Sequence, residues 1–411
     1  METQYHRFYE FITCKKNRAL DRCTFRSYNM EIFKSFSKDN RFWEQLLEDT
    51  NQFQEAALYL NALHLDQNYD AIFKRFFQKY NSEEGIQELA KIRVYVKGVE
   101  KEVALNQLKN NPPENEENLS DWGESLFEGK PWCIVLDKVS GLIDELSLPI
   151  AEWTQYLLSK RPPGSLVIEI SPYIGRYGYT PFGAHIDVPG ISVLHLHLGP
   201  NKKEMTIWDA DEFRKLTKSD SHVCHDFEPF LSEGKTYSIE AGDIFHLPAG
   251  THYHIGKADE FSIGLTIGLK KETSRSLLQK AMKEHQKSGQ EANESDVVES
   301  YNLKKQSNAG FMKTPLLKVV ADSELFGKKV KVNSPFQLIL KGRNEGKLEV
   351  YVRGRSFTTP NYSEVISCIQ LLNQGEAITL TEDYFKQEGM EKSKVMSLMT
   401  QLYNYRGIIL V

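Results

Sequence analysis

The sequence predicts an α+β protein with a jelly-roll or β-sandwich core, a mainly helical N-terminal region and a winged-helix-like module at the C-terminus. Three features lead to this prediction. Apolar residues recur at helical spacing over much of the first hundred residues. Short β-rich segments separated by Gly, Pro and Asn follow between 165 and 269, as in antiparallel sandwiches. Helical spacing then returns before a final apolar strand.

The N-terminal region is expected to be helical over 29–108, because apolar side chains recur there at intervals of three and four residues. The positions are Ile32, Phe33, Phe36, Trp43, Leu46, Leu47, Ala57, Leu58, Leu60, Leu63, Phe73, Phe76, Phe77 and Tyr80. We interpret the aromatic residues as packing residues and not as a cofactor site. Residues 109–130 interrupt this pattern, and the polar, acidic stretch 110–118, which contains Pro112 and Pro113, is typical of a loop. We therefore expect a mainly helical region at 1–128.

Residues 129–270 are expected to form the β-rich core. The expected strands are 132–136, 165–170, 191–198, 205–208, 236–239, 243–247 and 261–269, with a helix over 148–160. Strands that are short, closely spaced and joined by turns with Gly or Pro are typical of a jelly roll.

The composition changes again after the core. Residues 271–327 are charged and helical in character, and the polar stretch 287–295 predicts a loop or linker. In 328–411 the expected elements are strands 336–340 and 348–352, a helix from Val365 to Leu372, a helix near 390–403 and a last strand at 407–411. Helices followed by a terminal strand predict a small winged-helix-like module.

Composition excludes some protein classes. The chain of 411 residues is 40% hydrophobic and 26% charged, as in globular proteins of two to three domains. It contains no run of about eighteen uncharged apolar residues, so no membrane span is expected. The start of the chain lacks the pattern of a secretory signal. The five cysteines are scattered and never form a Cys-x-x-Cys pair, which argues against disulfides and structural zinc. We expect a cytoplasmic protein.

Charge is distributed unevenly along the chain. The formal net charge is −5, yet 313–355 contains ten Lys or Arg and four Asp or Glu. Such asymmetry is typical of a surface for nucleic acid or an acidic partner. The alternative is a solvated basic face on an ordinary domain.

The pattern that carries chemistry is a histidine-rich centre with a carboxylate. Eight of the eleven histidines lie between His185 and His254. In His185-Ile186-Asp187, the first and third residues point to the same face of a strand, so both can reach one ion. Two histidines with one carboxylate leave coordination positions open, which is the facial triad of non-heme iron(II) oxygenases.

The third metal ligand should come from a strand that lies across the first. In Gly242–His254, a Gly-Asp turn precedes an apolar strand, and a Pro-x-Gly turn precedes His252 and His254. These two histidines are two residues apart, so both point to the same face of the strand and spacing alone does not choose between them. We favour His254 because of the Ile255-Gly256 continuation, while His252 and His246 are weaker candidates.

These motifs resemble the Jumonji-C branch of the cupin superfamily. The matching residues are Gly183-Ala-His185-Ile-Asp187, then Gly242-Asp243, Pro248-Ala-Gly250 and His254, with lead-in segments Pro162–Ser165 and Tyr179–Gly183. The resemblance spans about 130–270 and implies a double-stranded β-helix that uses Fe(II), 2-oxoglutarate and O2. The order of segments is also similar to that of the ribosomal oxygenases. It implies a dimerising helical segment at 271–327, and hence a homodimer, followed by the winged-helix-like module at 328–411.

The resemblance also implies a cation for the far carboxylate of 2-oxoglutarate, since a buried carboxylate without a partner is costly. Lys203, at the start of a strand, is the first candidate and Lys202 the second, although both could be exposed turn lysines. Hydroxyl donors to the cosubstrate are expected among Tyr179, Thr180, Ser262 and Thr266. His195 and His197 share a strand face, and they either line the same cavity or serve as structural histidines.

The function that this implies is hydroxylation of a side chain in a protein or peptide substrate. One alternative is a metal-binding cupin with other chemistry, which would use more histidine ligands. Another is a non-catalytic protein-binding or nucleic-acid-binding module, whose binding would weaken steeply with salt.

Overall fold

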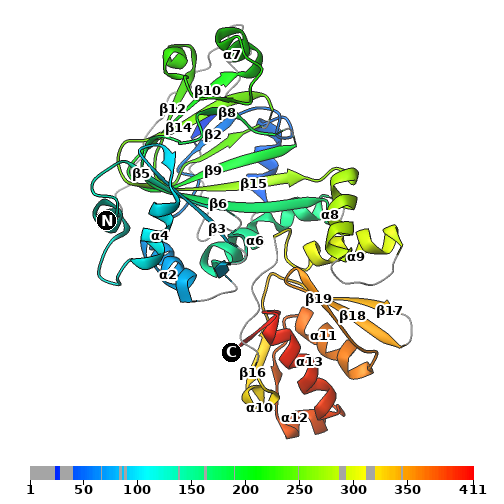
Figure 1. Cartoon of the computed structure of the whole chain (residues 1–411). Helices are drawn as coiled ribbons and strands as arrows, with labels where there is room; N and C mark the ends of the chain where they lie inside the picture. The colour runs from blue at the N-terminus through cyan, green and yellow to red at the C-terminus, as the bar shows by residue number, and fades with distance from the viewer. Residues whose placement is uncertain are drawn as a thin grey trace, which may run out of the picture.

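The computed structural model describes residues 24–27, 40–65, 67–82, 86–87, 90–137, 139–161, 164–188, 190–248, 250–286, 293–311, 320–343 and 346–411. It is a mixed structure of helices and largely antiparallel sheets, which confirms the α+β class (Figure 1). No helix in these ranges is both long and apolar enough to cross a membrane.

The N-terminal part contains both helices and strands. Its elements are β1 (Thr24–Ser27), α1 (Arg41–Asp49), β2 (Ala57–Leu60), α2 (Tyr69–Ser82), β3 (Lys91–Val96), β4 (Val99–Glu100), α4 (Glu102–Asn110), α5 (Leu119–Leu126), β5 (Trp132–Asp137) and α6 (Asp144–Ser159). Helical spacing had placed Ala57–Leu60 in a helix, which is wrong: this short apolar run pairs with β13 (Ile244–Leu247) as a strand. A run of four apolar residues fits either state, and pairing decides between them. The expected helical positions Ile32, Phe33 and Phe36 lie outside the described residues.

The central part supplies most of the strands. They are β6 (Leu166–Arg176), β7 (Gly178–Tyr179), β8 (Ala184–Ile186), β9 (Ile191–Pro200), β10 (Lys203–Asp209), β11 (Val223–Cys224), β12 (Lys235–Ile239), β13, β14 (His252–Ala258) and β15 (Ser262–Lys271), with α7 (Ala210–Thr217) and the short helix η2 (Glu228–Glu233) inserted after β10. A nine-stranded sheet has the order β1-β2-β13-β9-β15-β6-β5-β3-β4. A six-stranded sheet contains β11-β8-β14-β10-β12, with β7 paired to β14.

The two faces of the nine-stranded sheet differ in chemistry. Ile168, Ile170 and Ile267 point to one face and pack with helix residues such as Trp153 and Phe73 in the main hydrophobic core. These helices lie on the side away from the six-stranded sheet (Figure 1). Alternate residues point to the opposite face, which is turned toward the six-stranded sheet. The candidate site residues His185 and His254, from the six-stranded sheet, and His195, from the nine-stranded sheet, lie between the two sheets.

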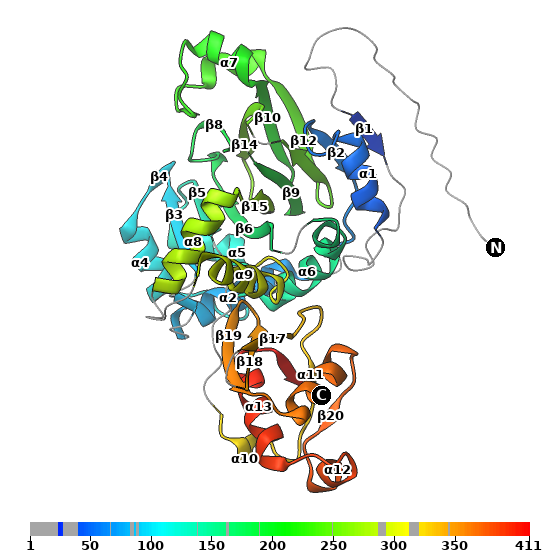
Figure 2. The same cartoon turned by 90° about the vertical axis from the view of Figure 1, so that its right-hand side faces the viewer.

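The C-terminal part has its own hydrophobic core. After α8 (Ser274–Gln286) and α9 (Glu294–Gln306) come α10 (Asp322–Leu325), β16 (Lys329–Val332), β17 (Ile339–Arg343), β18 (Lys347–Val352), β19 (Arg355–Pro360), α11 (Ser363–Asn373), β20 (Ile378–Thr379), α12 (Glu382–Gln387), α13 (Lys392–Asn404) and β21 (Ile408–Leu410). These last elements lie below α9 and far from α7 (Figure 2). Of the expected 287–295 loop, residues 287–292 lie outside the described ranges.

Part of the basic stretch 313–355 contacts acidic residues within the chain. Lys341 pairs with Glu299 of α9 at 2.8 Å, and buried Arg353 lies 3.8 Å from Asp144 at the start of α6. These cations contribute to contacts between the C-terminal part and the rest of the chain. The charge excess is therefore a weaker indication of a nucleic-acid surface than the sequence implied.

Candidate metal centre and adjoining cavity

Three side chains with metal-ligating atoms meet between the sheets. His185 lies on β8 and His254 on β14, where antiparallel pairing sets these two residues directly opposite each other. Asp187 follows β8 directly. The ligand atoms of His185, Asp187 and His254 all lie within 4.8 Å of one another, and no other such group of three occurs in the described ranges. The two imidazole rings are 4.2 Å apart between centroids.

Hydrogen bonding leaves a ring nitrogen of His185 free to bind a metal ion, and burial favours the neutral form of His254. The Nδ1 of His185 lies 3.0 Å from the Gly183 carbonyl oxygen, to which it donates, so Nε2 remains available for an ion. The Nδ1 of His254 is buried and has no hydrogen-bond partner among the described residues. Burial, followed by the nearby His185, lowers the pKa of His254 well below its usual value. His254 is therefore neutral, as metal binding requires.

The carboxyl group of Asp187 lies in the same partly dehydrated environment. Burial raises its pKa above the usual value, and the nearby His185 side chain opposes this effect. A divalent cation would remove the cost of burying this carboxylate, because an ion is the largest charge available in such a site. The donor set of two imidazoles and one carboxylate fits iron(II).

A glycine controls the turn that leads into His185. Gly183 has a φ of +75°, and a Cβ added to it would lie 2.6 Å from the Cys224 carbonyl oxygen. A side chain there would be strained and would also displace backbone from β11 or from the turn. Because the Gly183 carbonyl accepts a hydrogen bond from His185, this displacement would also move the His185 imidazole.

We predict that Gly183→Ala weakens Co(II) binding by about tenfold, as loss of an orienting contact to a metal ligand does, in a calorimetric titration. Gly178→Ala is the matched control, since its φ is +62° and no atom lies within 4 Å of the added Cβ. Both variants carry backbone strain, but only the first has a clash. Equal Co(II) affinity in the two variants would contradict the orienting role of this turn.

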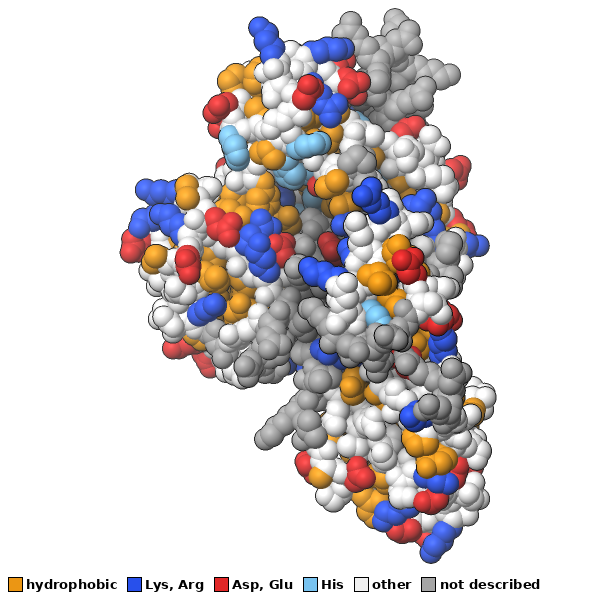
Figure 3. Space-filling view, turned by 45° about the vertical axis from the view of Figure 1, so that its right-hand side comes forward, with side chains coloured by type: hydrophobic (Ala, Val, Ile, Leu, Met, Phe, Trp, Pro, Cys, Tyr) orange, Lys and Arg blue, Asp and Glu red, His pale blue; other side chains and the backbone are white. Residues whose placement is uncertain are grey.

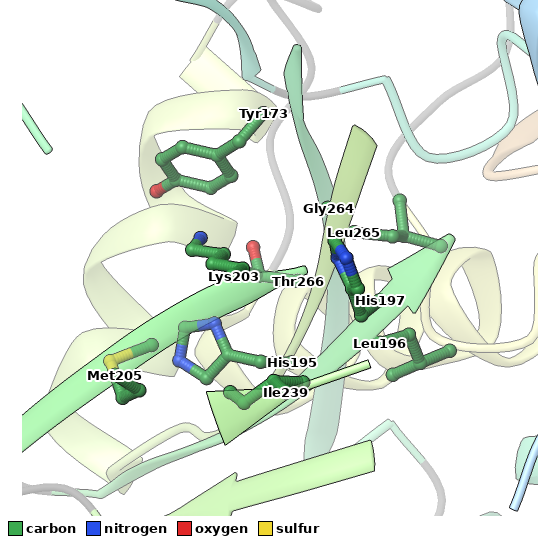
Figure 4. A pocket seen from close by; sticks show the side chains of 10 residues that line it. All are labelled: Tyr173, His195, Leu196, His197, Lys203, Met205, Ile239, Gly264, Leu265 and Thr266. Carbon is green, nitrogen blue, oxygen red and sulfur yellow. The ribbon is translucent and has the colours of Figure 1, made fainter. Parts of the chain in front are cut away.

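A cavity adjoins the three side chains. The empty space in and around it, open solvent included, is about 280 Å³. Its lining residues are Tyr173, His195, Leu196, His197, Lys203, Met205, Ile239, Gly264, Leu265 and Thr266. Lys203, His195 and Thr266 project into it from different strands (Figure 4). The His195 ring, which lines the cavity, lies 6.1 Å from the His254 ring between centroids, so the cavity lies beside the candidate metal centre.

Lys203 is a buried cation in this cavity. The residue is 7% exposed, and no described residue accepts a hydrogen bond from its ammonium group or pairs with it. Its Nζ lies 5.5 Å from the centre of the Tyr173 ring and 5.8 Å from that of Tyr177. Burial lowers the pKa of Lys203 to about 8. A buried ammonium group without a counter-charge is costly, so this position favours an anionic ligand.

The candidate hydroxyl donors occupy different environments. Thr266 lines the cavity, and its hydroxyl donates to the Ser171 carbonyl at 3.0 Å. Thr180 is buried, and its Oγ1 accepts from the Gly256 amide at 3.3 Å. Tyr179 packs against Phe227 at 5.0 Å between ring centres and does not line the cavity. Its role as a donor to a cosubstrate stays a prediction.

The remaining sequence candidates lie apart from the group of three. The Nδ1 of His252 bonds with the Thr251 hydroxyl at 2.8 Å, and that of His246 donates to the Glu55 carbonyl at 2.9 Å. Lys202 is exposed. His195 and His197 both line the cavity, and His197 also bonds through Nε2 to the Asn201 carbonyl at 2.6 Å. Lining the cavity and serving as a structural, hydrogen-bonded histidine are therefore compatible roles for His197.

Two aromatic residues near Lys203 were missed by the sequence interpretation. Tyr173 lines the cavity, and the buried hydroxyl of Tyr177 lies beside that of Ser262, which had been considered as a donor. Both tyrosines come from the end of β6 or just after it. No motif marks them, because only the pairing of β6 with β15 brings Tyr173 opposite Gly264 and close to Lys203.

The sheet surface beside the cavity remains partly exposed. Ser171 and Glu169 on β6 pair with Thr266 and Gly268 on β15, and all four are half-buried. Figure 3 shows a hollow on this side of the molecule, with histidine side chains near its upper edge.

Comparisons with known proteins give structural similarity without detectable sequence similarity. No protein-family model matches the sequence, and neither does any curated protein. The fold is similar to the X-ray structure of Escherichia coli ycfD, with a TM-score of 0.49 and 14% identity over 90% of this chain and 98% of that one. A crystal structure of the E. coli ribosomal oxygenase YcfD gives a TM-score of 0.48 at 14% identity, with the same coverage. The YcfD complex with cobalt and 2-oxoglutarate gives 0.47 at 13% identity, again over 90% and 98% of the two chains.

Proposed function

We propose that this protein is an Fe(II)- and 2-oxoglutarate-dependent oxygenase that hydroxylates a side chain of a protein or peptide. One observation carries the proposal: His185, Asp187 and His254 converge beside a cavity that contains a buried lysine without a counter-charge. A metal-binding triad alone fits many reactions. The adjoining cation selects those that use an anionic cosubstrate.

The three converging side chains would hold iron(II), and their arrangement leaves positions for other ligands. Iron bound there supplies the activation of O2 that hydroxylation of an unreactive C–H bond needs. Lys203 would pair with the far carboxylate of 2-oxoglutarate. The buried Nε2 of His195, which has no hydrogen-bond partner among the described residues, is available to a bound molecule in the same cavity.

The walls of the cavity would keep bulk water from the reacting groups. Leu196, Met205, Ile239 and Leu265 contribute apolar surface around the polar side chains. An apolar boundary strengthens the attraction between the Lys203 ammonium and a carboxylate, because the local dielectric constant is lower than that of water. The far carboxylate of the cosubstrate would thus be bound more tightly by Lys203 than it would be in water.

A polypeptide substrate is supported by the partly exposed strip of β6 and β15 beside the cavity. An extended segment needs a surface longer than a small-molecule pocket, and this strip continues away from Thr266 toward Gly268. We also infer that the paired sheets form a double-stranded β-helix and that 328–411 forms a winged-helix-like module. We further infer a cytoplasmic homodimer. The cytoplasmic location is supported by Cys133, Cys224 and Cys368, which form no disulfides.

The experiment is to incubate purified protein with Fe(II), 2-oxoglutarate and O2 and to measure succinate. We expect release of succinate that ceases when a chelator removes iron and resumes when iron is restored. Candidate polypeptides incubated in the same mixture are then analysed by mass spectrometry for the gain of one oxygen atom. Binding of iron without any succinate release, in the presence of such polypeptides, would contradict the proposal.

A further inference from the structure

We propose that Arg93 is a positioning residue for the metal centre, because it holds Phe182 against the imidazole ring of His185. The inference rests on the proposed role of His185 as a metal ligand. Arg93 lies on β3, near the edge of the nine-stranded sheet and outside the group of converging ligands. It would therefore act through Phe182 and not by contact with the ion.

The guanidinium group of Arg93 is held in one orientation. Its Nε and Nη2 donate to the two carboxylate oxygens of Asp137 at 2.7 and 3.1 Å. Its Nη1 donates to the Tyr95 hydroxyl at 2.9 Å, and that hydroxyl donates to Glu100 at 3.1 Å. Bidentate pairing fixes the guanidinium plane, which a lysine could not do.

This fixed cation lies against the ring of Phe182. The Cζ of Arg93 is 4.8 Å from the ring centre, within the range of a cation–π contact. Tyr95 and Tyr173 pack edge-on against the same ring, with centroids 5.5 and 6.1 Å away. Phe182 is thus held from several sides by residues of β3 and β6.

The other side of Phe182 meets the metal centre. Its ring and that of His185 are 5.9 Å apart between centroids and nearly perpendicular, at 86°. Gly183, whose carbonyl accepts from His185, follows Phe182 directly in the chain. The Phe182–Gly183 turn therefore contacts the imidazole both by packing and by a hydrogen bond. If Phe182 were free to move, the orientation of His185 would be less well defined.

The test compares Co(II) binding by titration calorimetry and the visible spectrum of the Co(II) protein in four variants. Arg93→Met should raise the dissociation constant by roughly threefold to thirtyfold, the range expected for loss of a partly buried cation–π contact. Phe182→Leu should have at least the same effect. Arg93→Lys keeps a cation near the ring but loses the bidentate pair, so its affinity should fall between wild type and Arg93→Met.

Arg176→Met is the matched control. Arg176 also pairs through two nitrogens with a carboxylate, that of Glu124, and the two side chains are 32% and 33% exposed, against 20% and 25% for Arg93 and Asp137. Thermal unfolding should shift by a similar amount in both arginine variants. Of the two variants Arg93→Met and Arg176→Met, only Arg93→Met should alter the Co(II) affinity and the Co(II) spectrum.

The outcomes separate this inference from the proposed function. If the wild-type protein binds no Co(II), the proposed metal centre is wrong and the positioning role is overturned with it. If the wild type binds Co(II) and Arg93→Met binds it equally well with the same spectrum, the positioning role alone is wrong. Weaker binding in Arg93→Met and Phe182→Leu, with Arg176→Met unchanged, supports it.

Discussion

Asp187→Ala is expected to reduce iron-dependent succinate formation by on the order of 1000-fold or more, because the site loses its one anionic ligand. The carboxylate is the group that matches a divalent cation in charge, and its ligand oxygen lies within 4.8 Å of both imidazole ligand atoms. Two neutral imidazoles would hold iron(II) too weakly for turnover. Succinate release and Co(II) affinity are the measurements.

Asp187→Asn and Asp187→Glu refine this prediction. Asparagine keeps the shape and removes the charge, whereas glutamate keeps the charge and moves it by one methylene group. We expect both to be severely impaired, since charge and position are each required. His252→Ala, which changes a neighbouring histidine outside the converging group, should retain turnover. Normal succinate release by Asp187→Ala would show that the proposed metal centre is wrong.

Lys203→Met is expected to raise the KM for 2-oxoglutarate by about 100-fold, which corresponds to about 3 kcal/mol for a charge-assisted hydrogen bond in a buried site. Methionine retains most of the length of the side chain and removes the cation. The residue is 7% exposed, so solvent would not replace the lost charge. Steady-state kinetics with varied 2-oxoglutarate measure the change.

The affinity for 2-oxoglutarate should also depend on pH. Burial lowers the pKa of Lys203 to about 8 in the free protein, so the ammonium form prevails below that pH and is lost above it. Binding of the carboxylate requires the ammonium form. The apparent dissociation constant should therefore be flat below pH 8 and rise by up to tenfold per pH unit above it, as proton linkage requires.

Lys202→Met is the control for both measurements, since this neighbouring lysine is exposed. We expect it to leave the KM and the pH profile unchanged. Lys203→Arg retains its charge at high pH, so where it binds 2-oxoglutarate its profile should be flat above pH 8. A 2-oxoglutarate KM in Lys203→Met equal to that of wild type would exclude Lys203 as the carboxylate partner.

Much of the candidate site follows from local sequence geometry. Alternation along a strand puts His185 and Asp187 on one face, and no tertiary information is needed for that inference. The same alternation puts His252 and His254 on one face of their strand, so it does not show which of them is the ligand. The structure distinguishes them, because the register of β14 against β8 sets His254 directly opposite His185, and the ligand atoms of His254 converge with those of His185 and Asp187.

Long-range pairing accounts for what the sequence interpretation missed. Ala57–Leu60 satisfies helical spacing, yet its backbone bonds to β13 and it is a strand. Arg93 and Phe182 are separated by almost ninety residues, and nothing in their local sequence indicates the contact between them. Such contacts depend on strand order, which local periodicity does not encode.

The sequence by itself determined the α+β class and placed His185 and Asp187 on one face of an extended segment, because both inferences depend only on the spacing and type of neighbouring residues. The tertiary structure alone decided which distant imidazole meets His185 and Asp187, and that Lys203 is buried beside them. The physical reason is that the burial of Lys203 and the convergence of the three side chains depend on how the strands pair and in which register. A side chain becomes a buried cation or a neighbouring ligand only when a second strand is set against its own.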